Sequence, residues 1–295
     1  MGSITAETRT WHAAGNILRE RADNFRMQLS RVRESFDPEA IHDLRVSSRR
    51  LREAITIFSK LFKKRRRSSL LEELKALVKS MGSIRNCDEA IRFFSTLTEK
   101  CAAGVKPVVS RLIATLSANR EQEKLCLHAT LEKIDPDSFV AQVEKLCKTP
   151  RNAKSLKVTL RQPVSLTVLA ALAKREKTIL ELLPEALMEE NATPLHRLRI
   201  SVKRLRYRLE LLAPFAKGDY KGVYSTIKSY QEILGHIHDL DVFATLADTD
   251  REETAAGKSL QKLILKQRKK LFAEFIRLNE ASPLAEIGDR IKELI

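Results

Sequence analysis

Two short segments of the chain concentrate basic residues at a spacing suited to holding phosphate. Residues 42–52 read HDLRVSSRRLR, and residues 196–206 read HRLRISVKRLR. Because successive residues of a helix turn by about 100°, four basic residues of each segment fall within an arc of about 80°. We call these two sets the basic stripes: they consist of His42, Arg45, Arg49 and Arg52, and of His196, Arg199, Lys203 and Arg206.

Each basic stripe borders an apolar stripe and contains no acidic residue. Several like charges at the edge of a core repel one another and lose hydration at a cost. A phosphate-bearing anion would relieve that cost, since phosphate oxygens match the fork of a guanidinium group. The pattern therefore predicts an anion site. The alternative is that the arginine stems cover the core while their heads stay in water.

The histidine that opens each basic stripe, His42 or His196, has three interpretations. It contacts a phosphate, it is phosphorylated or binds a metal, or it forms a hydrogen bond near the start of its helix. Neither histidine is surrounded by the Asp, Glu and His residues that a metal site or an activated nucleophile needs. The four cysteines are scattered without a CxxC pair, so neither a zinc site nor another cofactor is predicted.

The two segments belong to a longer internal repeat. Residues 41–52 match residues 195–206 at an offset of 154, and MGSIRNCD (81–88) matches LGHIHDLD (234–241) at an offset of 153. Two matching blocks in nearly one register indicate two copies of one helical unit.

Other basic residues follow the repeat. Lys75 and Lys228 share the offset of 153, and Arg19 falls opposite Lys174 if the loops differ by one residue. We therefore expect two repeats, residues 1–150 and residues 151–295, that together form one domain.

The second pair of matching blocks predicts a helix boundary in each repeat. Gly82 and Gly235 are expected to end one helix. The polar residues that follow are expected to cap the next helix and to fill its first turn, where a carboxylate suits the helix dipole: Asn86 and Asp88, and Asp239 and Asp241. The alternative for the aspartates of this set is that they orient arginines of the basic stripes.

Apolar residues recur at helical spacing along most of the chain, which predicts an all-α fold with short connections. Asp37 is a predicted N-cap, with Pro38 just inside the helix that carries the first basic stripe. Residues 151–163 lack this helical spacing, and we predict that they form a linker between the repeats with a locally extended backbone. The predicted helices cover residues 4–33, 38–62, 67–81, 86–101, 105–133, 136–147, 165–189, 194–213, 219–234, 239–256, 258–280 and 283–294.

Composition narrows the function. The 295 residues include 54 Lys and Arg against 38 Asp and Glu, a net charge of +16, which favours a polyanionic partner. No apolar run is long enough to cross a membrane and no signal-peptide core is present, so a cytoplasmic protein is expected. Aromatic residues make up 5% of the chain, few for stacking single-stranded nucleic acid. Nucleic-acid binding through the KKRRR run at 63–67 is the alternative function.

At the two basic segments the sequence resembles the CHAD family, named for a histidine in an α-helical domain. HDLRVSSRRLR (42–52) and HRLRISVKRLRY (196–207) are similar to its paired signatures, and the two Gly…Asp blocks fit as well. The resemblance covers nearly the whole chain. It implies two four-helix-bundle-like halves related by pseudo-twofold symmetry, with a basic cleft or pore between them.

The resemblance also implies a ligand, inorganic polyphosphate, without catalysis and with association to polyphosphate-containing granules. An enzyme that uses His42 or His196 as a nucleophile is a further alternative. Arg50 and Arg204 point away from the basic stripes on an ideal helix, so they face a different wall or the solvent. The implied ligand contacts are His42, Arg45, Arg49, Arg50, Arg52, His196, Arg199, Lys203, Arg204 and Arg206, followed by Lys75, Lys228, Arg19 and Lys174.

Overall fold

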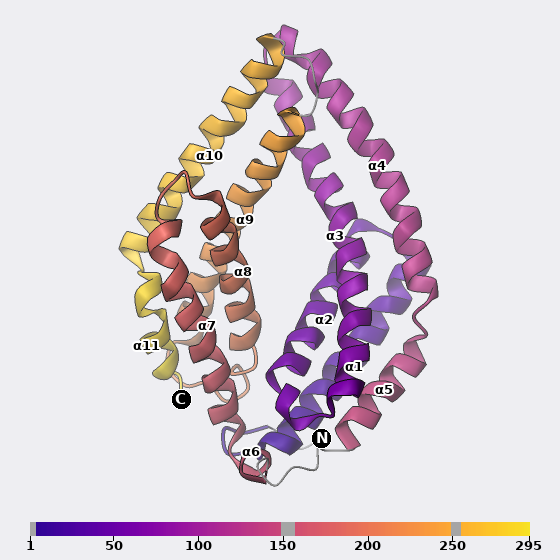
Figure 1. Ribbon diagram of the computed structural model, residues 1–295, viewed down its shortest axis with the longest axis vertical. Coiled ribbons are helices and arrows are strands. Elements are labelled where there is room, and N and C mark those ends of the chain that lie inside the picture. Colours follow the sequence, from indigo (N-terminus) through magenta and orange to yellow (C-terminus); the bar gives the residue numbers. More distant parts are fainter. Residues whose placement is uncertain (1–3, 149–156, 249–254) are drawn as a thin grey trace.

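The computed structural model describes residues 4–148, 157–248 and 255–295. Within these residues the chain forms helices and no strands, which confirms the predicted all-α fold (Figure 1). None of the described helices is long and apolar enough to cross a membrane. The main elements are α1 (Thr10–Ser35), α2 (Pro38–Ile57), α3 (Lys64–Lys100), α4 (Lys106–Glu132), α5 (Pro136–Lys148), α6 (Lys157–Arg161), α7 (Val164–Ala186), α8 (Ala192–Leu209), α9 (Tyr220–Asp248), α10 (Ala255–Ala281) and α11 (Ile287–Lys292).

The helices form two groups that lie side by side in Figure 1. In the first group α2 packs between α1 and α3, while α4 packs on α3 and α5 on α1. In the second group α8 packs between α7 and α9, and α10 packs on α9. The groups meet where α2 lies against α8, so the helices that carry the two basic stripes are neighbours. This order fits one helical unit per half; the twofold relation between the halves stays a prediction.

The helix that carries the first basic stripe begins as predicted. Asp37 accepts a hydrogen bond from the backbone N–H of Ala40 at 2.8 Å, and Pro38 occupies the first turn. Hydrogen bonds from Ser35 and Ala40 lower the pKa of the Asp37 carboxyl. The cap satisfies a donor that the first turn of a helix leaves free. The helix ends earlier than predicted, at Ile57, and a short 3₁₀ helix, Ser59–Leu61, follows it.

The core has two parts. The main cluster joins α1, α2, α3, α5, α7, α8 and α9 around side chains such as Phe25, Leu51 and Tyr230. A second cluster, which we call the distal cluster, lies where the far ends of α3 and α4 meet α9 and α10. There the rings of Phe93 and Phe243 stack with centroids 4.7 Å apart. The two groups of helices are therefore in apolar contact at both ends of the molecule.

The buried positions of α1 and α7 fix the register between the repeats. Six buried positions of α1 recur in α7 at an offset of 154. These are Thr10, Ala14, Leu18, Phe25, Leu29 and Val32 in α1, and Val164, Val168, Leu172, Ile179, Leu183 and Ala186 in α7. The predicted pairing of Arg19 with Lys174, which requires an offset of 155, is therefore wrong. The register places Arg21 opposite Arg175.

The prediction that Gly82 and Gly235 end helices is also wrong. Both lie inside long helices, α3 and α9, and a Cβ built at either position would meet no atom within 4 Å. A glycine in a helix interior costs about 1 kcal/mol relative to alanine, and the packing of these long helices overrides that preference. Asn86 and Asp239 are consequently helix-interior residues rather than caps.

The two aspartates of the same blocks bind arginines outside the basic stripes. Asp88 accepts a hydrogen bond from Arg120 of α4, and Asp241 accepts one from Arg268 of α10, both at 2.5 Å. They therefore fasten neighbouring helices and neither fill a first turn nor orient the stripes.

The segment predicted as a linker, residues 151–163, lies partly outside the described residues. From Lys157 to Arg161 the chain is helical (α6), so the expected extension is not found there. Just beyond, the backbone pairs with the start of the chain, since Val164 N–H donates to Thr8 O at 2.9 Å. Part of the predicted helix 239–256 also lies outside the described residues.

Candidate anion-binding site

A cavity of about 300 Å³, which we call the central cavity, lies among α2, α3, α8 and α9. Residues of both basic stripes line it: α2 contributes Arg45 and Arg49, and α8 contributes Arg199 and Lys203. The other residues that line the cavity are His42, Val46, Arg85, Asn86, Glu89, Arg206, Tyr207, Lys228, Gln231, Glu232, Gly235, His236 and Asp239.

Four cations of the central cavity lack a counter-ion. Across the described residues, Arg45, Arg49, Arg199 and Lys203 form no ion pair and no side-chain hydrogen bond. Burial, followed by the charges of Arg49 and Arg199, lowers the pKa of the Lys203 ammonium to about 6. Burial, followed by the charge of Arg49, lowers the pKa of Arg45 to about 9. The cavity thus holds positive charges that have lost hydration and repel one another.

Most acidic residues of the central cavity are occupied by other cations. Arg85 pairs with Glu89 at 3.0 Å, and Lys228 pairs with Glu232 at 3.6 Å. The remaining one, Asp239, is half-buried, and this burial raises the pKa of its carboxyl even though the nearby Arg199 acts in the opposite direction. A bound anion would supply the charge balance that these side chains leave incomplete.

The stripe histidines hydrogen-bond to α3 and α9. Arg85 Nη1 donates to His42 Nδ1 at 3.1 Å, and His196 Nδ1 lies 3.0 Å from His238 Nδ1. Burial and then neighbouring arginines lower the pKa of both His42 and His196, and that of His238 to about 4. All three rings are therefore neutral at pH 7 in the free protein.

The contacts of the stripe histidines bear on their interpretation. Among the residues that the structure describes, no group of three or more His, Cys, Asp or Glu could hold a metal ion. His42 does form a hydrogen bond near the start of its helix, and its partner is Arg85 of α3. Arg85 and His238, which sequence reasoning missed, hold equivalent places in the repeat: they share the offset of 153, a signal present in the sequence.

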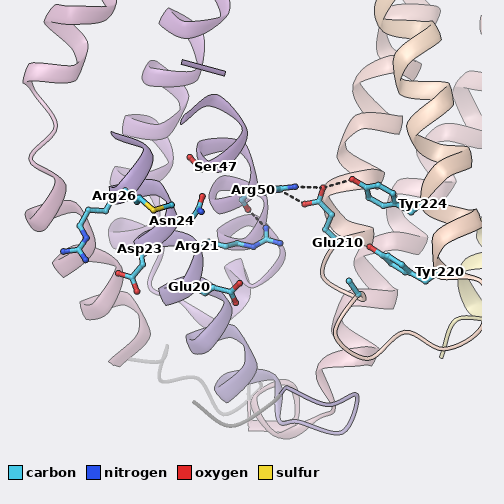
Figure 2. A pocket seen from close by; sticks show the side chains of 12 residues that line it. Glu20, Arg21, Asp23, Asn24, Arg26, Ser47, Arg50, Glu210, Tyr220 and Tyr224 are labelled. Carbon is cyan, nitrogen blue, oxygen red and sulfur yellow. Dashed lines mark hydrogen bonds and ion pairs between the residues drawn. The ribbon is translucent and has the colours of Figure 1, made fainter. Parts of the chain in front are cut away.

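Two arginines of the predicted site share one carboxylate as a partner. Figure 2 shows Arg50 of α2 reaching Glu210, which follows the end of α8. The Nε of Arg50 donates to Glu210 at 2.8 Å, and Nη1 of Arg206 donates to the same carboxylate at 3.1 Å. Arg206 also donates to Tyr224 Oη at 2.6 Å. This group borders a second cavity of about 870 Å³, the Glu210 cavity, which Arg21 and Tyr220 also line.

Arg52 and Arg204 lie at a third cavity, of about 340 Å³, which we call the Arg175 cavity. Neither has an ion pair within the described residues, and burial, followed by the charge of Arg204, lowers the pKa of Arg52. Lys75 lines the same cavity and pairs with Glu72 at 3.7 Å. Arg50 and Arg204 thus face walls other than the central cavity, one of the two outcomes that helix geometry left open.

The last two predicted contacts lie apart from these cavities. Arg19 donates to Glu144 at 2.7 Å and so fastens α1 to α5. Lys174 is exposed on α7. The corrected register instead places Arg21 in the Glu210 cavity and Arg175 in the third cavity. The spacing of apolar residues in the segments that form α1 and α7 contains the signal for this register, and the prediction missed it.

Comparisons with known proteins place the fold. Among solved structures, PptA from Streptomyces chartreusis matches with a TM-score of 0.71 at 16% identity, over 92% of this chain and 100% of that chain. The CHAD domain from the plant Ricinus communis matches with a TM-score of 0.65 at 18% identity, over 100% of this chain and 95% of that chain. No curated protein matches. The family model of the CHAD domain matches residues 16–248, and the chain therefore belongs to the CHAD family.

Proposed function

We propose that this protein binds inorganic polyphosphate in the central cavity and does so without catalysis. The observation that carries the proposal is the set of three half-buried arginines without an ion pair, Arg45, Arg49 and Arg199, beside the half-buried Lys203, whose ammonium form their charges disfavour. A chain of phosphates carries a negative charge at every unit and can meet all four, two from each half of the molecule. The resemblance to the CHAD family supports the same ligand. Association with polyphosphate-containing granules would follow from this binding.

The shape of the site favours bare phosphate over nucleic acid. The central cavity has a volume of about 300 Å³. Apart from histidines, Tyr207 is the one aromatic residue among those that line it, and its side chain is buried. Bases need aromatic platforms or open grooves, whereas a phosphate chain needs only donors. The KKRRR run, which motivated the nucleic-acid alternative, lies at the exposed start of α3.

Titration calorimetry with long-chain polyphosphate tests the proposal. The double variant Arg45→Ala/Arg199→Ala is expected to bind about 100-fold more weakly, because two charge-assisted contacts are lost. The matched control Lys266→Ala/Lys269→Ala removes the same formal charge from the exposed face of α10 and should bind like wild type. A folded double variant that binds like wild type contradicts the proposal.

Two further arms separate the alternatives. Repeating the titration at a second salt concentration should lower the affinity, since counterions are released on binding. Duplex DNA should not displace polyphosphate; stoichiometric displacement would favour the nucleic-acid function. Phosphate release in the presence of Mg²⁺ that disappears in His42→Ala would contradict the non-enzymatic part of the proposal.

A further inference from the structure

The Glu210 cavity and the Arg175 cavity occupy equivalent places in the two repeats. The offset of 154 relates Arg50 to Arg204 and Arg52 to Arg206, as in the basic segments. The same offset, fixed by the buried positions of α1 and α7, relates Arg21 to Arg175. Two of these pairs line the two cavities at corresponding positions, Arg21 and Arg50 in one and Arg175 and Arg204 in the other, whereas Arg206, the counterpart of Arg52, lines the central cavity.

An acidic residue that binds the arginines is present in one of the two cavities and absent at the related position of the other, although further carboxylates line both: Glu20 and Asp23 in the Glu210 cavity, and Glu53 and Glu72 in the Arg175 cavity. Glu210 corresponds at the same offset to Thr56. Glu210 accepts hydrogen bonds from Arg50, Arg206 and Tyr224, and only 13% of its side chain is exposed. Thr56 instead donates its hydroxyl to the backbone carbonyl of Arg52 on its own helix, at 2.8 Å.

The arginines of the Arg175 cavity consequently keep their charge uncompensated. Arg52 and Arg204 have no ion pair within the described residues, and the Nε of Arg175 is buried without a hydrogen-bond partner. The carboxylate of that cavity that lies deepest, Glu53, is bound to Arg208 at 2.6 Å, with both side chains 7% exposed. The cavity is thus poor in available negative charge.

The Arg175 cavity continues the charge of the central cavity. Arg49, which lines the central cavity, and Arg52, which lines the Arg175 cavity, are three residues apart on α2 and so lie on the same face of that helix. In line with this spacing, the charge of Arg49 contributes, after burial and Arg204, to the lowered pKa of Arg52. A polyanion in the central cavity therefore finds its next unbalanced cations in this direction.

We propose that polyphosphate leaves the central cavity past Arg52, Arg175 and Arg204, and that Glu210 closes the equivalent exit past Arg50. This inference rests on the proposed function. It adds to that function the route of the polyphosphate chain, a binding residue outside the basic segments (Arg175) and a residue that determines the route (Glu210). Glu210 acts as an internal counter-ion: it satisfies Arg50 and Arg206 and repels phosphate.

Two ligand-binding comparisons test the route. Arg204→Ala and Arg50→Ala remove the same group from equivalent positions. Because only Arg204 lacks a partner, Arg204→Ala should weaken binding of long-chain polyphosphate about 10-fold, and Arg50→Ala should change it by less than about 3-fold. Arg175→Ala should behave like Arg204→Ala. Equal losses in Arg50→Ala and Arg204→Ala would overturn the proposal.

Exchanging the counter-ion gives a second test. Thr56→Glu places a carboxylate among Arg52, Arg175 and Arg204, so it should raise the melting temperature of the free protein and weaken polyphosphate binding about 10-fold. Glu210→Gln should steepen the salt dependence of binding by about one counterion. Thr56→Glu that binds like wild type, measured on protein shown to be folded, would refute the route.

The same titrations distinguish the two proposals. If wild type does not bind polyphosphate, both fail. If wild type binds and Arg45→Ala/Arg199→Ala does not, while Arg50→Ala and Arg204→Ala are alike, only the route fails and the proposed function stands.

Discussion

Lys203 should take up a proton when polyphosphate binds. In the free protein, burial and neighbouring arginines lower the pKa of its ammonium from 10.5 to about 6. The group is therefore about 1% protonated at pH 8 by simple titration. A phosphate chain placed against Lys203 opposes both the burial and the repulsion that lower this pKa, because it brings negative charge next to the ammonium group.

The magnitude follows from the two protonation states. If the bound pKa returns above about 9, binding at pH 8 takes up about one proton per protein molecule. The sign is fixed: because the bound form holds more protons, the affinity rises as the pH falls, and the rise levels off below the free pKa of about 6. The stripe histidines contribute little at pH 8, because even a return of their pKa to the ordinary histidine value of about 6.5 leaves them largely neutral at that pH.

Calorimetry in buffers of different ionisation enthalpy measures this uptake directly. At pH 8, the observed binding enthalpy plotted against buffer ionisation enthalpy should have a slope of about one proton. The matched variant Lys203→Arg keeps the charge in place without a titration near neutrality, so it should bind with a slope near zero. A wild-type slope near zero, or the same slope in Lys203→Arg, would refute the reasoning.

Two further predictions concern stability. Glu53→Gln should lower the free energy of unfolding, measured in urea, by about 3–5 kcal/mol, because it leaves the buried Arg208 without its counter-ion. The double variant Glu53→Leu/Arg208→Met should lose clearly less of this free energy. A loss below about 1 kcal/mol in Glu53→Gln would contradict this view of the pair. Gly82→Ala should stabilise the protein by about 0.5–1 kcal/mol, because it lies inside α3 and the new methyl group meets no atom within 4 Å. Gly218→Ala is the contrasting control: the φ of Gly218 is +62°, so this change should destabilise the protein. A fall in the melting temperature of Gly82→Ala would contradict the prediction for α3.

The sequence was sufficient for the fold class and for the centre of the site because both depend on local periodicity. The spacing of Arg45 and Arg49 puts them on one face of α2 whatever surrounds the helix, and the repeat places Arg199 and Lys203 on the same face of α8. Packing α2 against α8 then brings the four cations to one cavity.

The errors arose where tertiary contacts outweigh local preference. A glycine followed by a capping residue is a common helix end, yet Gly82 lies in the interior of the 37-residue helix α3. The aspartate six residues on, Asp88, binds Arg120 of α4 and thereby helps to hold that helix in place. Likewise, only the structure shows that Glu210 binds Arg50, since these residues are 160 positions apart.

The distal cluster has a consequence for the order in which the molecule assembles. It joins segments that are far apart in the sequence, with Phe93 stacked on Phe243 across about 150 residues, whereas the pairs α3–α4 and α9–α10 are consecutive hairpins. Closing so long a loop is slow compared with forming a hairpin. We therefore expect the hairpins α3–α4 and α9–α10 to form first and to join each other last. Amide hydrogens around the distal cluster should then exchange sooner than those of the main cluster. We therefore expect the junction of α3 and α4 with α9 and α10, at the top of Figure 1, to open more readily than the rest of the fold.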